Sequence, residues 1–153
     1  SQQIFEIALT KLKEINTGLA SRYNLKKALI EFGPAGFPFE QFVAALFEAQ
    51  GYKVDTNIQA QGRCVSHELD VVAIKDNIHH MIECKFHNNQ GYKSDVKVSL
   101  YIKARFDDLH AAWQADLNDH HKAHQAWIVT NTTFTEDAIQ FATCVGIQML
   151  SWN

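Results

Sequence analysis

The chain has 153 residues, of which 46% are hydrophobic and 20% are charged, and its formal net charge is −3. These values are typical of a folded globular protein and exclude a disordered chain. They also exclude an overall positive charge of the kind that attracts nucleic acids. The sequence contains no apolar run long enough to span a bilayer and no signal peptide pattern. Its three cysteines, without a CxxC pair, favour neither a disulfide framework nor a zinc cluster, so we expect a cytoplasmic location.

The first third of the chain has the spacing of amphipathic helices. Apolar residues recur at helical intervals over about 4–15 and 21–32, and Gly33-Pro34 ends the second pattern. A third helix is predicted from Pro38 to Gly51, because Phe39, Phe42, Val43, Leu46 and Phe47 all fall on one face. We therefore divide the chain into an N-terminal helical extension, residues 1–33, and a main domain, residues 34–153. Since the chain begins at Ser1 and not with Met, we expect it to be part of a longer protein.

The pattern then changes from helical spacing to strands. Three strands are predicted over 53–65, 67–75 and 79–86, followed by a long helix over about 95–118. The remaining elements are a strand at "AWIVTN", a helix with Thr135 as N-cap and Gly146 as its end, and a last strand at "IQMLSW". This order predicts an α/β fold with a mixed central sheet flanked by helices on both faces.

The second and third strands form a hairpin whose register follows from its turn. Asp76 and Asn77 both tolerate the left-handed backbone of a tight turn, so Lys75 should pair with Ile78. Counting back along both strands places Asp70 opposite Glu83. Because side chains alternate along a strand, Asp70, Glu83 and Lys85 should project from one face. The neighbouring positions are apolar on both faces, with Val72, Ile74 and Met81 on one and Leu69, Val71, Ile82, Cys84 and Phe86 on the other.

Two carboxylates opposed across a strand pair repel each other, and hairpins built for stability alone avoid this arrangement. A hard divalent cation such as Mg²⁺ would relieve the repulsion, and Lys85 could hold a phosphate or orient a water. The alternative is a buried ion pair or triad without chemistry. Spacing alone leaves both interpretations open.

Glu40 lies in the first turn of the third predicted helix, beside its apolar stripe. A carboxylate at this position favours the helix dipole, which is sufficient reason for its presence. If the helix packs on the sheet near Asp70, Glu40 becomes a third carboxylate for the same metal.

These residues resemble the core of the PD-(D/E)xK nucleases, and in particular the Mrr-type restriction endonuclease domains found after an ATP-cone. The matching segments, in order, are "FPFEQFVAALFEAQGYKV", "QGRC", "HELDVVA", "IECKF", "DVKVSLYIKARFDDL", "IVTNTTFTEDAI" and the closing Trp152. The resemblance covers about residues 21–152. It implies a restriction-endonuclease-like fold over residues 34–153, with an N-terminal helical extension.

The resemblance also implies roles for individual residues. Asp70 and Glu83 would be metal ligands, Glu40 would complete the metal site, and Lys85 would be the catalytic lysine. The implied activity is Mg²⁺-dependent endonucleolytic hydrolysis of DNA, with Mn²⁺ as a substitute cation. Besides DNA, the expected partners are a second copy of the chain in a homodimer and an ATP-cone domain N-terminal to this region in a longer parent chain.

Other residues are candidates for contact with substrate. His87 shares the parity of Glu83 and Lys85 along the third strand, while Lys97, Tyr101 and Arg105 lie on one side of the long helix and could meet phosphates. The alternative for this second group is a solvated helix face. Two other functions stay open on the same fold: a DNA-binding module with little or no catalysis, and a branched-DNA or junction-resolving nuclease.

Overall fold

The computed structural model describes residues 36–89, 91–116 and 123–152. The two helices predicted over 4–15 and 21–32 lie outside these ranges. The described elements are α3 (Phe37–Ala49), β1 (Lys53–Gln61), β2 (Ser66–Lys75), β3 (Ile78–Lys85), β4 (Lys93–Ser94), α4 (Val96–Ala115), β5 (Ala123–Thr130), β6 (Thr133–Phe134), α5 (Glu136–Val145) and β7 (Gln148–Ser151). None of the described helices has the length and apolar character needed to cross a bilayer.

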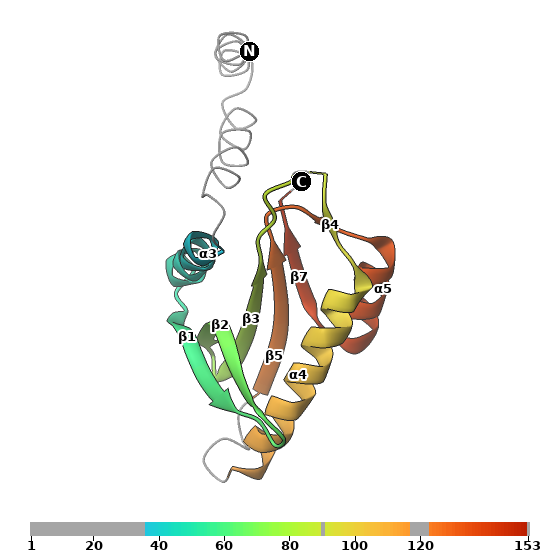
Figure 1. Ribbon diagram of the computed structural model, residues 1–153. Coiled ribbons are helices and arrows are strands. Elements are labelled where there is room, and N and C mark those ends of the chain that lie inside the picture. Colours follow the sequence, from blue (N-terminus) through green and yellow to red (C-terminus); the bar gives the residue numbers. More distant parts are fainter. Residues whose placement is uncertain (1–35, 90, 117–122, 153) are drawn as a thin grey trace.

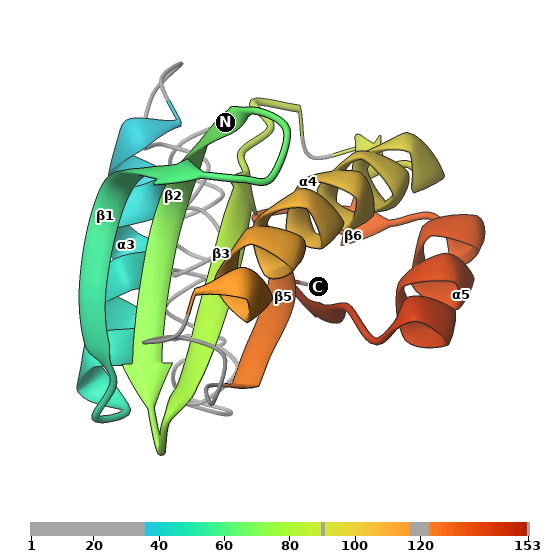
Figure 2. The same ribbon diagram turned by 90° about the horizontal axis from the view of Figure 1, so that it is seen from below.

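Five strands form one mixed sheet in the order β1-β2-β3-β5-β7. The β1-β2 and β2-β3 pairs are antiparallel, whereas β3-β5 and β5-β7 are parallel. Helix α3 covers one face of this sheet and α4 covers the other, with α5 beside α4 (Figures 1 and 2). The predicted α/β architecture, a mixed sheet between helices, is therefore confirmed. The short strands β4 and β6 pair in a separate two-stranded sheet that the sequence did not predict.

Each face of the sheet carries its own apolar core. Phe39, Val43 and Phe47 of α3 pack with Val71 of β2 and Ile82 of β3. The core on the α4 face is built mainly from Leu69, Met81, Ile102, Leu109, Ala126, Ile128, Ala138 and Ala142. Strand β3 is therefore buried from both sides, as its sequence predicted.

The hairpin turn lies where the sequence placed it. Asp76 and Asn77 have φ angles of 51° and 62°, and Lys75 pairs with Ile78. The β2-β3 ladder continues from this pair to Val71–Ile82. Asp70 and Glu83 are the next residues along the two strands, just past the last ladder pair.

One side-chain position differs from simple alternation. Leu69 was expected on the same side as Val71, but Leu69 belongs to the core under α4 and Val71 to the core under α3. The change of side occurs at Asp70. There the partner strand β1 has Asn57 at a φ of 53°, between the Thr56–Val71 and Ile58–Leu69 pairs. A left-handed residue interrupts the regular pleat, so the strands bend beside Asp70.

The helix boundaries follow local capping chemistry. Asp95 precedes α4, and its carboxylate accepts a hydrogen bond of 3.0 Å from the Lys97 N–H. Thr135 caps α5 through Ala138 N–H in the same way, and Gly146 ends the helix at a φ of 77°. Both predicted caps of α5 are confirmed.

The first predicted strand was too long, because β1 ends at Gln61. Residues 62–65 form a turn instead, closed by a hydrogen bond of 2.8 Å from Gly62 N–H to the Val65 carbonyl. Asp108 of α4 holds this turn, since its carboxylate accepts hydrogen bonds from Cys64 N–H at 2.8 Å and Val65 N–H at 3.2 Å. The His67 ring also bonds to it at 2.8 Å. These bonds lower the pKa of Asp108 to about 2, with the His67 contact as the largest cause.

Gly62 has no room for a side chain. A Cβ atom there would lie 2.8 Å from the Val65 carbonyl oxygen and still closer to the Asp108 carboxylate. We predict that Gly62→Ala lowers the free energy of unfolding by about 1–3 kcal/mol, as overpacked sites do. Gly36→Ala is the matched control, because its Cβ would meet Glu40 at an ordinary 3.5 Å. Urea unfolding of both variants and the parent measures the difference, and equal losses in the two variants would contradict the prediction.

Candidate active site

The predicted metal carboxylates lie where the sheet pairing is interrupted. Asp70 has no partner in the β1-β2 ladder or in the β2-β3 ladder. Its side chain takes the place of a backbone acceptor, since Oδ2 accepts a hydrogen bond of 2.7 Å from the Cys84 N–H. The Asp70 carboxylate is thus held to β3 at Cys84, the residue directly after Glu83.

Glu83 is a buried carboxylate held between two cations. The Lys85 ammonium donates to Oε1 at 2.6 Å, and the Arg105 guanidinium donates to Oε2 at 2.6 Å. Both carboxylate oxygens therefore have charged partners, and charge-assisted bonds of this length are strong. The pairing offsets the cost of burying an ionised carboxylate beneath α4.

Burial and mutual repulsion act on the carboxyl groups of this region. Burial, followed by the Glu83 charge, raises the pKa of Asp70 to about 6, although the Cys84 N–H and Lys85 act in the opposite direction. Burial also raises the pKa of Glu40, with further contributions from Glu68 and Glu83. Glu40 of α3 therefore lies within electrostatic range of the hairpin carboxylates, as the sequence suggested it could.

The donor set has the chemistry that a hard divalent cation requires. Four interacting carboxylates, from Glu40, Glu68, Asp70 and Glu83, face two cations, from Lys85 and Arg105. The formal excess of negative charge and the oxygen ligands fit Mg²⁺. Among the residues that the structure describes, however, no three side chains are already gathered as a metal-binding group. The carboxylates influence one another electrostatically, but Asp70 and Glu83 are oriented toward hydrogen-bond donors of the protein, namely the Cys84 N–H, Lys85 and Arg105.

The backbone after Lys85 is tied to the end of β5. The Thr130 hydroxyl donates to the Lys85 carbonyl at 2.8 Å. Asn131, which is 1% exposed, accepts from His87 N–H and donates to the His87 carbonyl, both at 2.8 Å. The backbone at Lys85 and two residues after it is thereby held against the end of β5.

The residues suggested for substrate contact differ in how exposed their side chains are. Lys97 is exposed and Tyr101 is 58% exposed, so both side chains are accessible on α4. His87 is half-buried, with its ring 2.9 Å from the Ser94 hydroxyl and 4.2 Å from the Tyr92 ring centre. Arg105 is buried, and its guanidinium is engaged by Glu83.

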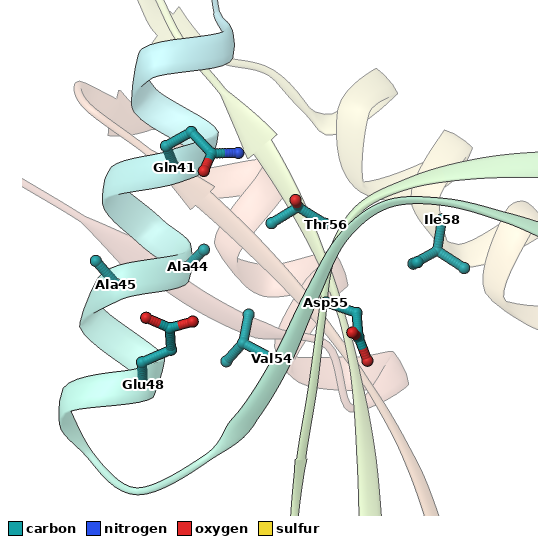
Figure 3. A pocket seen from close by; sticks show the side chains of 8 residues that line it. All are labelled: Gln41, Ala44, Ala45, Glu48, Val54, Asp55, Thr56 and Ile58. Carbon is teal, nitrogen blue, oxygen red and sulfur yellow. The ribbon is translucent and has the colours of Figure 1, made fainter.

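Two pockets lie on different parts of the domain. One, of about 290 Å³, is lined by Ser66, His67, Glu68, Asp70, Tyr101 and Arg105, and so reaches the candidate site. The other, of about 460 Å³, lies between α3 and the edge strand β1. Figure 3 shows Gln41 and Glu48 of α3 across from Val54 and Thr56 of β1 in this second pocket. It contains none of the predicted site residues.

Sequence reasoning missed three features of the site. Glu68 adds a carboxylate, and its parity with Asp70 along the strand was the available signal. Arg105 lies at helical spacing between Ile102 and Leu109, which marks it as part of the buried face. The bonds from Asn131 to His87 join segments 44 residues apart, and no local pattern indicates them.

Comparisons with known proteins identify the family of the chain. A family model described as a restriction endonuclease, the catalytic domain of the Mrr type, matches residues 35–152. An uncharacterized protein from Archaeoglobus fulgidus is 42% identical over 111 residues, which cover 72% of this chain and 58% of the relative. The chain thus spans less than two thirds of the length of that curated relative.

Solved structures share the fold. The crystal structure of a protein of unknown function is 40% identical with a TM-score of 0.68, covering 77% of this chain and 59% of that one. Can2 from Sulfobacillus thermosulfidooxidans, in complex with cyclic tetra-adenylate, has a TM-score of 0.57 at 22% identity, covering 74% and 32%. A repair endonuclease from Pyrococcus abyssi has a TM-score of 0.52 at 15% identity, covering 80% and 47%.

The family match includes all of the described residues, and so every element that carries a candidate site residue. The chain therefore belongs to the Mrr-type restriction endonuclease family, with the restriction-endonuclease-like fold.

Proposed function

We propose that this domain is a Mg²⁺-dependent DNA endonuclease that hydrolyses phosphodiester bonds. The observation that carries the proposal is the gathering of Asp70, Glu83 and Lys85 at the interrupted end of the hairpin, with Glu40 within electrostatic range. A stable hairpin does not need one buried carboxylate, Glu83, with half-buried carboxylates around it. The membership of the chain in a restriction endonuclease family supports the same activity.

Asp70, Glu83 and Glu40 are the residues that would hold the metal. When bound, a divalent cation polarises the phosphate and acidifies a coordinated water. The chain's own contribution is to keep these carboxylates within electrostatic range of one another in a partly buried setting, where the repulsion between them favours a cation. Asp70 is already fixed in place by the Cys84 N–H at 2.7 Å.

Lys85 is suited to act on the attacking water or on the developing negative charge. Its ammonium donates to Glu83 Oε1, but its side chain is 31% exposed and so can turn toward a substrate. The bond from Thr130 fixes the Lys85 backbone, while its ammonium group is partly exposed. Lys85 therefore has a fixed backbone and an ammonium group that a substrate can contact.

Accessible residues of α4 provide a surface for DNA beside the site. Lys97 can pair with a phosphate, and Tyr101 borders the pocket that reaches Asp70. His87 follows Lys85 by two residues, so the alternation of side chains along an extended chain predicts that both project to the same side. We assign phosphate and sugar contacts to these three residues, because the formal net charge of −3 provides no general attraction to DNA and local contacts must supply it.

A second candidate is a DNA-binding module with little or no turnover. The observation favouring it is that both oxygens of Glu83 are engaged by protein cations. A metal must then share the Glu83 carboxylate with Lys85 and Arg105 or displace one of them. Cleavage assays decide between the two candidates.

We predict that the parent protein cleaves DNA in the presence of Mg²⁺ or Mn²⁺ and that Asp70→Asn and Lys85→Met each reduce the rate by about 100-fold or more. Supercoiled plasmid, linear duplex, four-way junction and single-stranded DNA are the substrates, and nicked or linear products are quantified on gels. Lys75→Met is the matched control for charge, because Lys75 bonds to Gln50 at the far end of the hairpin.

Equal cleavage by the parent and both site variants would contradict the site assignment. DNA binding by the parent without cleavage of any substrate would favour the binding module. Preferential cleavage of the junction would instead identify a branched-DNA nuclease.

Asp70 also makes the stability of the protein depend on pH in the absence of divalent cations. Its folded-state pKa of about 6 lies above the ordinary value of 3.8. Between these values the folded protein binds a proton that the unfolded chain does not, so stability rises as the pH falls from about 6 to about 4. Above pH 6 the ionised carboxylate reduces stability.

We therefore predict that Asp70→Asn melts at a higher temperature than the parent at about pH 7.5 in EDTA, and that this advantage shrinks toward about pH 4.5. Asparagine keeps an acceptor for the Cys84 N–H, so the comparison isolates the charge. Asp76→Asn, in the exposed turn, is the control for removing a carboxylate elsewhere on the same hairpin. A melting difference between Asp70→Asn and the parent that stays constant over this range would refute the prediction.

A further inference from the structure

The strands that carry Asp70 and Glu83 need a connection beyond the end of their ladder. Regular β2-β3 pairing stops at Val71–Ile82, one pair before these carboxylates. Two contacts take over from the ladder. One is the bond from Cys84 N–H to Asp70, and the other is made by Arg105 of α4.

Arg105 bridges the two strands with a single guanidinium. Nη1 donates to Glu83 Oε2 on β3 at 2.6 Å, and Nη2 donates to the backbone carbonyl of Glu68 on β2. The planar fork of arginine can hold two acceptors in fixed relative positions, which a lysine ammonium does far less well. The guanidinium thus sets the spacing between a predicted metal ligand and the strand that carries the other.

The surroundings of Arg105 keep it in this position. The residue is 8% exposed, and the Tyr101 ring lies 5.4 Å from its guanidinium carbon, within the range of a cation–π contact. Its Nε has no hydrogen-bond partner among the described residues. An arrangement selected only for stability would rarely bury a cation with an unsatisfied donor.

The two cations on Glu83 differ in how easily they can leave. The Lys85 side chain is 31% exposed, whereas that of Arg105 is 9% exposed and has a second acceptor on β2. A divalent cation that takes a Glu83 oxygen would therefore displace Lys85 from Oε1. Arg105 would stay on Oε2.

We propose that Arg105 is a positioning residue that joins β2 to β3 through Glu68 and Glu83 and thereby orients the Glu83 carboxylate for a divalent cation. This inference rests on the proposed metal-dependent function and adds a residue to it. Groups that orient metal ligands in this way typically contribute 10- to 100-fold to metal affinity.

Isothermal titration of the whole chain with Mn²⁺ alone tests the role without an activity assay. Arg105→Met is expected to weaken Mn²⁺ binding by about 10- to 100-fold relative to the parent. Lys85→Met removes the same charge from the same carboxylate and is expected to bind Mn²⁺ at least as tightly as the parent. Lys103→Met is a control on the same helix, because it breaks only an exposed ion pair with Asp107 at 2.6 Å. Its Mn²⁺ affinity should equal that of the parent.

Mn²⁺ binding by folded Arg105→Met that is as tight as or tighter than that of the parent would overturn the inference while leaving the metal site intact. Failure of the parent itself to bind Mn²⁺ would refute the metal-dependent function and this role together, so the two failures differ. Thermal melting reports whether each variant is folded. If Arg105→Met does not fold, Arg105→Lys provides the test: it keeps the charge but not the fork, so weaker binding than the parent supports positioning and parental affinity refutes it.

Discussion

The buried negative charge at the end of the β2-β3 hairpin is the constraint on which the rest of this domain depends. Glu83 is buried under α4, and Asp70 is half-buried at a break in the strand pairing, so the protein must replace much of the water that would otherwise stabilise these carboxylates. The compensating groups come from different parts of the chain. Lys85 and the Cys84 N–H belong to the strand itself, whereas Arg105 comes from the middle of α4. The packing of α4 on the sheet is therefore also what brings a compensating positive charge to Glu83.

Local chemistry made much of this predictable from the sequence. The Asp76-Asn77 turn fixed the hairpin register because both residues accept positive φ angles, and every pair from Lys75–Ile78 to Val71–Ile82 follows from it. The caps at Thr135 and Gly146 depend on neighbouring residues, so they were equally accessible. Spacing alone left open whether Asp70, Glu83 and Lys85 form a metal site or an ion-paired cluster without chemistry, and the resemblance to a nuclease family is what favours the metal site.

Features that depend on distant segments were not predictable in the same way. The first strand stops at Gln61 because Asp108, more than forty residues later, captures the backbone of the following turn. Arg105 resembled a surface residue by its type, but its place on the buried face of α4 gives it Glu83 as a partner. The exchange of bonds between Asn131 and His87 likewise needs the parallel pairing of β3 with β5. In each case the sequence shows the residue but not which distant residue it contacts in the fold.

Helix α4 connects two places that the chain itself keeps apart. Arg105 and Asp108 are three residues apart, so they lie one above the other on the helix, and one holds Glu83 while the other holds the turn after β1. That turn is consequently not an ordinary surface loop whose length can change at little cost. An insertion in it would pull on the helix that carries Arg105, so a longer turn would disturb the contact with Glu83 as well as the turn itself.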